Sequence, residues 1–270
     1  MSKTNRVVRL SLGTRGSALA MWQANWTKAT LEQKVPGILI KIVKIKTTGD
    51  RIQTVPLTKI GGKGLFTKEL DDSLLDGQID IAVHSLKDIP FMLPDGISLV
   101  AIGQREDPRD GLISLGRTLA EMPKGARIGT SSIRRQTQLR AHFPSLQPMM
   151  LRGNVDTRLR KLDEGRFDGL ILAVAGLKRL GYETRITEYL NPSMMLPAIG
   201  QGALAFVCRS GDIPTRELLS KIDHYNSHVA VTAERSLMAN LEANCQTPVA
   251  GHAEIKSDQL RLTGLIATLD

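Results

Sequence analysis

The sequence predicts an α/β protein made of two successive units, each with a mainly parallel sheet. Segments typical of strands alternate with segments typical of amphipathic helices over residues 7–86, and the alternation begins again at residue 126. Alternating strands and helices are typical of parallel βαβ units. Two turn-rich segments, 106–111 and 192–202, cross between the units. Two crossings favour a hinge, with a cleft between the two lobes.

The first unit begins with a strand, a helix and a second strand. Residues 38–45, ILIKIVKI, alternate apolar and polar side chains at a period of two, which indicates a strand. Residues 17–33 have helical periodicity, and Ser17 is a suitable N-cap for that helix. The next predicted helix ends at Gly77, a residue type common after a helix C-terminus. In order, the expected elements are strand 7–14, helix 17–33, strand 38–45, helix 65–77 and strand 79–86.

The second unit repeats this order. Its expected elements are strand 126–130, helix 131–143, strand 146–151, helix 155–165, strand 167–174 and helix 175–181. The apolar run 203–208 follows the second crossing and is typical of a further strand.

The last part of the chain differs from both units. Residues 228–245 predict a helix that runs into a loop, and residues 252–270 predict an antiparallel hairpin that turns at 256–259. This part is too small for a full domain, and it ends within a pattern. We therefore expect a C-terminal piece to be missing.

Positive charge dominates the composition, with 36 Lys and Arg against 27 Asp and Glu in 270 residues, a net charge of +9. This excess favours an anionic partner, which could be nucleic acid, a membrane or a small polyanion. Between Arg127 and Arg160 there are seven arginines, no lysine and a single acid, Asp156. Guanidinium groups suit bidentate binding of carboxylate or phosphate, so this segment is a candidate anion-binding region.

Several classes of protein lack support in the sequence. No apolar run is long enough for a transmembrane helix, and the N-terminus has no apolar signal segment. Two cysteines are too few for a disulfide framework, which suits a reducing compartment, so we expect a cytoplasmic protein. The sequence has no GxGxxG, HExxH, CxxC or EF-hand motif, so nicotinamide, zinc and calcium are not indicated.

The glycine-rich segment 59–70, KIGGKGLFTKEL, only superficially resembles a phosphate-binding loop. Gly64 follows Lys63 where that motif requires Ser or Thr, and no predicted strand leads directly into it. We interpret the segment as a mobile lid that carries Lys59 and Lys63.

Three polar clusters, 13–17, 129–135 and 151–158, follow predicted strands. The carboxyl ends of strands are where open α/β sheets bind ligands. Each cluster alone could be an ordinary capped loop, but three on the same kind of edge favour anion sites. Arg134 and Arg135 also lie in a first helical turn, where cations oppose the helix dipole. A bound anion explains their presence better than helix stability does.

The stretch DIAVHSLKDIP, residues 80–90, ends a predicted strand with the adjacent ions Lys87 and Asp88. They could form an ordinary surface ion pair or belong to a site. His84 lies within the strand pattern and is interpreted as a core or supporting histidine. Cys208 lies in an apolar strand and is interpreted as a small core residue. Cys245 lies in a loop and could be a bystander thiol, a nucleophile or an attachment point.

At this point the sequence resembles the porphobilinogen deaminase (hydroxymethylbilane synthase) family from Leu10 to about Gly251. The motifs that carry the resemblance, in the family's order, are VHSLKDIP, GGKGLF, REDPRD, GTSSIRRQ, LRGNVDTRL, LILAVAGLKRLG, LPAIGQGA and TAERSLMANLEANCQTP. The resemblance implies two lobes like those of type II periplasmic binding proteins and a small α+β C-terminal domain. The implied domains are residues 1–105 with 200–221, residues 106–199, and residues 222–270.

The resemblance also implies an activity: four porphobilinogen molecules are condensed head to tail into hydroxymethylbilane, and ammonia is released. It implies a dipyrromethane cofactor, thioether-linked to Cys245, in a loop where Ala243 and Asn244 replace two glycines common in the family. Asp88 would stabilise the cation formed on deamination, and Lys87 would bind a carboxylate and balance Asp88.

The remaining implied residues divide into two sets. Cofactor-binding residues would be Cys245, Lys87, Asp88, Ser85, Thr130, Ser132, Arg134, Arg135, Gly153 and Arg158. Substrate-binding residues would be Arg15, Ser17, Lys59, Lys63, Ser131, Arg152, Asn154 and Gln201. The expected partners are porphobilinogen and its linear oligopyrrole product, with no nucleic acid, membrane or metal, and the expected state is a monomer.

Two other classes of function are considered. A non-catalytic two-lobe protein that binds a carboxylated metabolite would share the fold and the arginine loops, but it would need neither Cys245 nor Asp88. A nucleic-acid-binding protein would fit the net charge. Aromatic residues make up only 4% of the chain, which leaves few platforms for base stacking and counts against that class.

Overall fold

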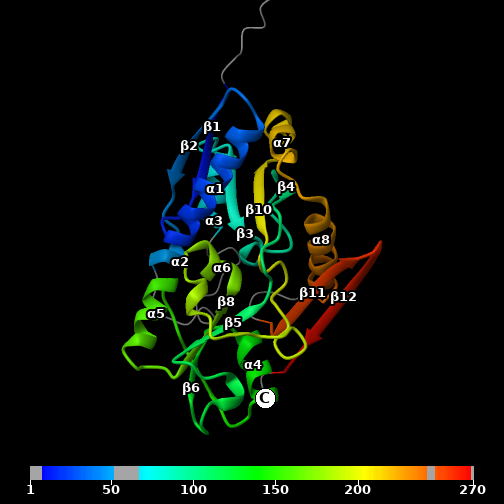
Figure 1. Ribbon diagram of the computed structural model, residues 1–270. Helices are drawn as coiled ribbons and strands as arrows, with labels where there is room; N and C mark the ends of the chain where they lie inside the picture. The colour runs from blue at the N-terminus through cyan, green and yellow to red at the C-terminus, as the bar shows by residue number, and fades with distance from the viewer. Residues whose placement is uncertain (1–7, 52–66, 242–246, 269–270) are drawn as a thin grey trace, which may run out of the picture. The chain divides into compact units, whose positions relative to one another are not determined.

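A computed structural model of the chain describes residues 8–51, 67–241 and 247–268 (Figure 1). The chain divides into two compact units, and each contains one five-stranded sheet. Unit 1 comprises Met1–Arg105 and Ala203–His228, and unit 2 comprises Glu106–Gly202 and Val229–Asp270. The predicted α/β class is confirmed. The division into three domains stays a prediction.

The sheet of unit 1 has the strand order β2–β1–β3–β10–β4. β1 is parallel to β2 and β3, whereas β10 runs antiparallel to β3 and β4. The predicted strands 7–14, 38–45, 79–86 and 203–208 correspond to β1, β2, β3 and β10. The bounds are β1 Val8–Thr14, β2 Ile38–Lys44, β3 Ile81–Ser85, β4 Ile97–Ile102 and β10 Leu204–Arg209.

Helices cover the sheet of unit 1. α1 packs against β1, β2 and β3, while α7 packs against β4 and β10 (Figure 1). As predicted, Ser17 is the N-cap of α1, and its side chain accepts a hydrogen bond from the Ala20 amide. A short 3₁₀ turn, η2, follows β3 directly. The bounds are α1 Ala18–Lys34, α2 Thr48–Arg51, α3 Lys68–Leu75, η2 Leu86–Asp88 and α7 Ile213–Ser220.

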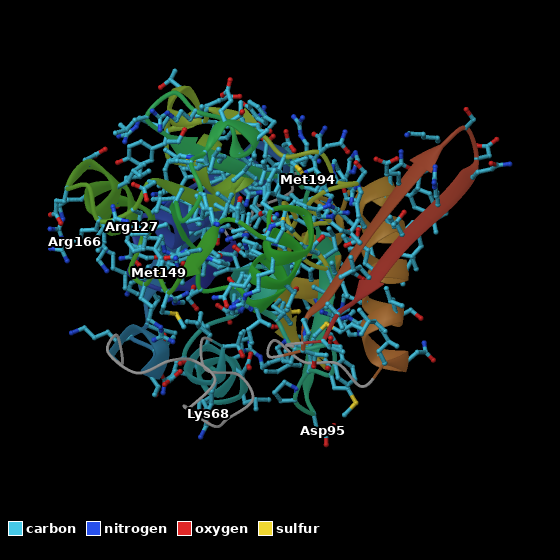
Figure 2. All side chains as sticks on the ribbon, turned by 90° about the horizontal axis from the view of Figure 1, so that it is seen from below. Lys68, Asp95, Arg127, Met149, Arg166 and Met194 are labelled. Atoms are coloured by element: carbon cyan, nitrogen blue, oxygen red, sulfur yellow. The ribbon has the colours of Figure 1, made fainter. Side chains whose placement is uncertain are left out.

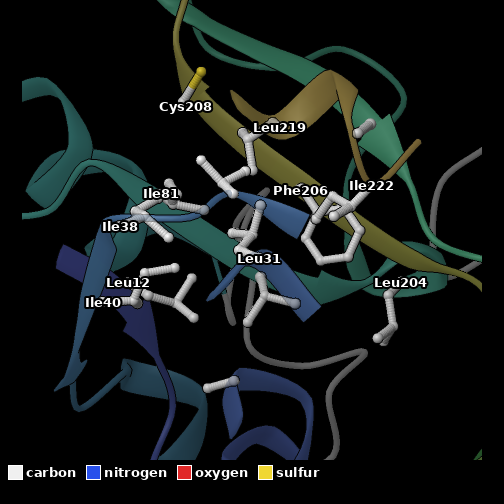
Figure 3. Packing of buried hydrophobic residues seen from close by; sticks show 14 residues of the cluster. Leu12, Leu31, Ile38, Ile40, Ile81, Leu204, Phe206, Cys208, Leu219 and Ile222 are labelled. Carbon is white, nitrogen blue, oxygen red and sulfur yellow. The ribbon is translucent and has the colours of Figure 1, made fainter. Parts of the chain in front are cut away.

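The apolar core of unit 1 lies between the sheet and the helices α1 and α7 (Figure 3). Leu12, Leu31 and Phe206 are each fully buried, and burial of one such side chain stabilises the fold by about 1.5–3 kcal/mol. Phe206 also stacks on Trp26, with 6.4 Å between ring centroids. Cys208 is buried in the same core, where burial raises the pKa of its thiol to about 11. Its interpretation as a core residue is confirmed.

The sheet of unit 2 has the order β7–β6–β8–β5–β9 and repeats the pattern of unit 1. β6 is parallel to its two neighbours, and β5 runs antiparallel to β8 and β9. The strands are β5 Asp110–Ser114, β6 Arg127–Gly129, β7 Gln147–Met149, β8 Gly169–Ala173 and β9 Glu188–Tyr189. The helices are η3 Leu119–Glu121, α4 Ile133–His142, α5 Val155–Asp163, α6 Val174–Arg179 and η4 Glu183–Arg185.

One strand of unit 2 departs from the expectation. The segment 106–111 was expected to be a turn-rich crossing, but β5 begins within it, at Asp110. The neighbouring strands β8 and β9 pair with both edges of β5, so hydrogen bonds from distant parts of the chain override the local turn signal.

The C-terminal part of unit 2 contains α8 (Tyr225–Asn240), most of which lies in this unit, and the strands β11 (Val249–Lys256) and β12 (Gln259–Ile266). The two strands form the predicted hairpin, with Lys256 opposite Gln259. Ser257 and Asp258 both have positive φ, as the tight turns favoured in hairpins require. None of the described helices is both long and apolar enough to cross a membrane.

Glu234 of α8 connects three segments of unit 2. Its carboxylate is fully buried and accepts hydrogen bonds from the amides of Gly200 and Ala253, each at 2.7 Å. Leu237, one turn further along α8, lies against Gly264, where an added Cβ would come within 2.8 Å of its side chain. The helix, the hairpin and the second crossing segment are therefore held together at this carboxylate.

Candidate functional site

A small pocket of about 60 Å³ lies in unit 1 at the carboxyl ends of β1 and β3. These strands are parallel neighbours, so the loops that follow them meet at one edge of the sheet. The residues that line the pocket are Arg15, Ser17, Leu19, Ala20, Gln23, Val83, His84, Ser85 and Asp88. The structure therefore brings together Arg15, Ser17, Ser85 and Asp88, which sequence analysis had placed at separate strand ends.

Asp88 reaches this pocket because β3 does not continue past Ser85. The chain turns through η2, whose first residue Leu86 is 1% exposed and donates its amide to the carbonyl oxygen of Ala203. The amide of Ile89 then bonds to the carbonyl oxygen of Leu86 and closes the turn. The turn is thus anchored by its apolar first residue, while Asp88 is exposed and lines the pocket.

Gln23 is a pocket residue that sequence analysis missed. It lies on α1, is 3% exposed, and donates a hydrogen bond from Nε2 to the hydroxyl oxygen of Ser85 at 2.8 Å. The signal was present, because Gln23 and Thr27 interrupt the buried apolar face of this helix. A polar side chain on a buried face needs a partner, and here the partner lies in the pocket.

His84 lines the same pocket and is 6% exposed. Burial, and then the nearby charge of Arg15, lower the pKa of His84 to about 4. The imidazole is therefore neutral at pH 7 and is a weak base there. This agrees with its interpretation as a supporting residue.

Unit 2 contains a buried charge cluster around Asp110, the first residue of β5. Asp110 is fully buried, and Arg134 and Arg135 are 5% and 6% exposed. The two guanidinium groups bind opposite oxygens of this carboxylate at 2.6 and 2.7 Å, and Gln201 donates to it at 2.8 Å. Burial alone would raise the pKa of Asp110, but the two arginines outweigh burial and hold that pKa far below its usual range.

The same arginines link both crossing segments to α4, because both bind Asp110 of the first segment and Arg134 also donates to the carbonyl oxygen of Leu196 in the second. Arg135 donates in addition to the carbonyl oxygen of Ile171 in β8. Two cations face one carboxylate in this cluster, which leaves a surplus positive charge. Among the described residues, the Nε atoms of Arg134 and Arg135 are buried and have no hydrogen-bond partner. Sequence analysis predicted a bound anion from the two arginines in the first turn of α4. Asp110 supplies part of the negative charge that they need, and their two Nε–H donors remain without a partner among the described residues.

The other polar residues of unit 2 lie in two loops. Thr130 is fully buried, and its hydroxyl accepts a hydrogen bond from the amide of Ser132, the N-cap of α4. In the next loop Gly153 has φ +115°, and an added Cβ would lie 2.8 Å from Thr157. Arg158 donates from Nε to the carbonyl oxygen of Gly153 at 2.7 Å. Ser131 lies in the first of these loops, and Arg152 and Asn154 lie in the second.

Some arginines of the segment 127–160 are not part of this cluster. Arg127 has a side chain that is 42% exposed and pairs with Asp168, and Arg160 pairs with Glu164 one turn along α5. Figure 2 shows Arg127 at the surface of unit 2. The count of arginines therefore overstated the number available to a ligand. Cys245, Lys59 and Lys63 lie outside the described residues.

Comparison with protein families gives two matches. The family described as "Porphobilinogen deaminase, dipyromethane cofactor binding domain" matches residues 10–217, and "Porphobilinogen deaminase, C-terminal domain" matches residues 228–270. The chain is 53% identical to the porphobilinogen deaminase of Geobacter sulfurreducens over 262 residues, which are 97% of this chain and 82% of that protein. It is 52% identical to that of Trichlorobacter lovleyi, over 97% of this chain and 84% of that protein.

Similar solved structures include a putative lipoprotein from Actinomyces odontolyticus. Its TM-score is 0.49 at 16% identity, over 85% of this chain and 98% of that one. Another is a TRAP periplasmic solute binding protein from Desulfovibrio salexigens, with a TM-score of 0.48 at 13% identity, over 88% of this chain and 82% of that one.

Proposed function

The chain belongs to the porphobilinogen deaminase family, and from that premise we propose that Asp88 is its principal catalytic residue. The activity is the condensation of porphobilinogen into the linear tetrapyrrole hydroxymethylbilane, with release of ammonia. The family match does not favour a non-catalytic binding protein, because the relatives are deaminases. The observation that carries the proposal is that Asp88 lines one pocket together with Arg15 and Ser17.

The chemistry needs a carboxylate at this place. Porphobilinogen loses ammonia to form an azafulvene cation, which the pyrrole carbon of the growing chain then attacks. Asp88 would accept a hydrogen bond from the pyrrole N–H and stabilise the positive charge as it develops. It would also move the proton that deamination takes up and condensation releases. One such electrostatic interaction is worth about 3 kcal/mol, roughly a hundredfold in rate.

Porphobilinogen carries an acetate and a propionate group, so the pocket must also bind carboxylates. Arg15 would supply a guanidinium group and Ser17 a hydroxyl. Lys87, the neighbour of Asp88 in η2, would bind a further carboxylate and balance the charge of Asp88. The proposed substrate site further includes Lys59, Lys63, Ser131, Arg152, Asn154 and Gln201.

The dipyrromethane cofactor of the family is an anion, and the cluster in unit 2 fits such a group. Arg134 and Arg135 have a surplus positive charge over Asp110, and their buried Nε donors lack partners among the described residues. When bound, the cofactor supplies the pyrrole carbon to which the first substrate unit is joined. We propose a thioether to Cys245, supported by its place in the loop EANCQTP. The other proposed contacts are Ser85, Lys87, Asp88, Thr130, Ser132, Gly153 and Arg158.

The setting in which the enzyme works is also a proposal. We infer a cytoplasmic monomer that binds neither nucleic acid nor membranes. The support is compositional: 4% aromatic residues leave few stacking platforms, and two cysteines suit a reducing compartment. The net charge of +9 is then explained by a substrate and product that carry several carboxylates.

Replacement of Asp88 tests the proposed mechanism. Asp88→Asn should keep the fold and lose nearly all turnover, because the amide has the same shape but cannot neutralise a cation. The measurements are ammonia release from porphobilinogen and oxidation of the product to uroporphyrin. Asp95→Asn is the matched control, since Asp95 is exposed in the same unit and should keep full activity. Porphobilinogen consumption by Asp88→Asn at the wild-type rate would remove Asp88 from the mechanism.

A further inference from the structure

We propose that Gln23 is a positioning residue that makes the Ser85 hydroxyl a hydrogen-bond donor to a carboxylate of porphobilinogen, in addition to the cofactor contact proposed above for Ser85. The inference rests on the proposed function, because it assigns the polarity of the same pocket. Gln23 is not expected to react with or bind the substrate itself. Its effect is transmitted through Ser85, which lines the pocket beside Asp88.

The direction of one hydrogen bond carries the argument. A serine hydroxyl has one hydrogen to donate and two lone pairs that accept. The amide nitrogen of Gln23 donates to the Ser85 oxygen at 2.8 Å and occupies one lone pair. The Ser85 hydrogen remains for a ligand. A carboxylate accepts hydrogen bonds only, so this orientation favours a carboxylate over a donor group in the pocket.

The hydroxyl of Ser17, which also lines the pocket, likewise accepts a hydrogen bond from α1. Ser17 accepts a hydrogen bond from the Ala20 amide at 3.3 Å and keeps its own hydrogen. Both donors to the two serines therefore come from α1. Arg15 adds a positive charge, and His84 adds none at pH 7 because its pKa is about 4. Arg15 and the two hydroxyl donors thus form a set that matches one carboxylate group, while the Asp88 carboxylate of the same pocket is the proposed acceptor for the pyrrole N–H.

Gln23 is held firmly enough to impose this orientation. Its side chain is buried at 3% exposure, and the Thr27 hydroxyl donates to its main-chain carbonyl oxygen at 2.7 Å. Because the Gln23 amide is buried, water cannot take the place of Ser85 as its acceptor. Without Ser85 the amide would be an unpaired buried donor, which is costly. The Ser85 oxygen is therefore the acceptor that this amide needs.

Gln23→Glu reverses the bond while it keeps the size of the side chain. A carboxylate at this position can only accept, so Ser85 would donate to it and lose its hydrogen for the substrate. We expect the KM for porphobilinogen to rise about tenfold or more, because a hydrogen bond to a charged group is lost. The kcat should stay within about twofold, because the bond is made in both the bound substrate and the transition state.

A pH profile separates this role from a merely structural one. Protonation of the introduced Glu restores a donor toward Ser85. The ratio of the variant KM to the wild-type KM should therefore fall as the pH is lowered and rise as the pH is raised. A general loosening of the fold would not produce this direction.

Three further variants complete the test. Gln33→Glu makes the same change on the exposed face of α1 and should leave KM unchanged. Ser85→Ala should raise KM as Gln23→Glu does, and the double variant should be no worse than Ser85→Ala alone, because both act through one hydrogen. Gln23→Met should raise KM less than Gln23→Glu, since Ser85 keeps its hydrogen. If the buried Glu prevents folding, which circular dichroism would reveal, Gln23→Met can be measured in place of Gln23→Glu.

Each outcome decides a separate question. Wild-type chain that carries its adduct and does not consume porphobilinogen would overturn the proposed function, and the inference with it. Wild-type turnover with an unchanged KM in Gln23→Glu, or in Ser85→Ala if Gln23→Glu does not fold, would overturn the inference alone. Additive effects of Gln23→Glu and Ser85→Ala would also overturn it. A raised, pH-dependent KM that is non-additive with Ser85→Ala would support it.

Discussion

The two units use the same sheet order to hold charge in opposite ways. In unit 1 the first residue of the antiparallel strand, Leu204, pairs with Ser85 at the end of β3. In unit 2 the corresponding residue is Asp110, which pairs with Ala173 at the end of β8. Leu204 is 2% exposed and apolar, and Arg15 of unit 1 lines an open pocket.

In unit 2, by contrast, the carboxylate of Asp110 binds the two arginines at the start of α4 in the interior of the unit. Only some of their N–H groups, among them the two Nε–H groups, are then left for a ligand. The comparison teaches that an acidic residue at the start of the antiparallel strand holds the arginines of unit 2 in the core, where unit 1 has the apolar Leu204 at the corresponding position.

The largest expected effect comes from breaking the charge cluster of unit 2. Asp110→Asn leaves Arg134 and Arg135 buried without their carboxylate, and removal of one partner from a buried ion pair costs about 3–5 kcal/mol. We expect a fall of that size in the free energy of unfolding, measured with urea and followed by circular dichroism. A loss below about 1 kcal/mol would show that the cluster does not hold the crossing segments.

A smaller effect should come from the buried titratable group of unit 1. The pKa of His84 is about 4 in the folded chain against 6.5 for an unperturbed histidine, so between these pH values the unfolded chain binds a proton that the folded chain does not. Stability from this group is therefore complete above pH 6.5 and falls as the pH is lowered to 4, by about 3 kcal/mol in total.

His84→Gln removes this titration. The difference in unfolding free energy between pH 7 and pH 4 should be smaller in the variant than in the wild type. Urea unfolding at several pH values measures it, with the wild-type chain as the reference. Equal pH slopes for the two proteins would contradict the low pKa of His84.

The smallest effect should come from a surface pair of unit 2. Asp163 accepts a hydrogen bond from Arg185, but both side chains are more than one-third exposed. Asp163→Asn should change the free energy of unfolding by about 0–1 kcal/mol, as is usual for exposed ion pairs. It is also the matched control for Asp110→Asn. A loss as large as that of Asp110→Asn would mean that burial does not separate the two kinds of pair.

Local sequence patterns were sufficient for most elements of the fold. The period-two alternation of residues 38–45 and the N-cap at Ser17 both predicted elements that the structure contains. The strand at Asp110 could not be predicted in this way. The segment DPRDG, which leads into this strand, has a turn signal, and the strand itself depends on pairing with residues about sixty and eighty positions later.

The candidate site shows the same limit. Spacing placed Arg15, Ser85 and Asp88 at strand ends, and the parallel pairing of β1 with β3 brings them to one pocket. The partners of buried groups were not predictable from spacing, because they come from distant segments. Asp110 and Gln23 are examples. An acid directly before the residues GLI, and a glutamine on the apolar face of a helix, are the signals that could have indicated them.

Gly200 and Gln201 are neighbours in the second crossing segment, and each contacts a different buried carboxylate. The Gly200 amide bonds to Glu234 of α8, and the Gln201 side chain bonds to Asp110. These two adjacent residues thus join α8 to the carboxylate that binds the paired arginines. A substitution that displaces this dipeptide would therefore disturb two buried carboxylates at once, one on α8 and one on β5.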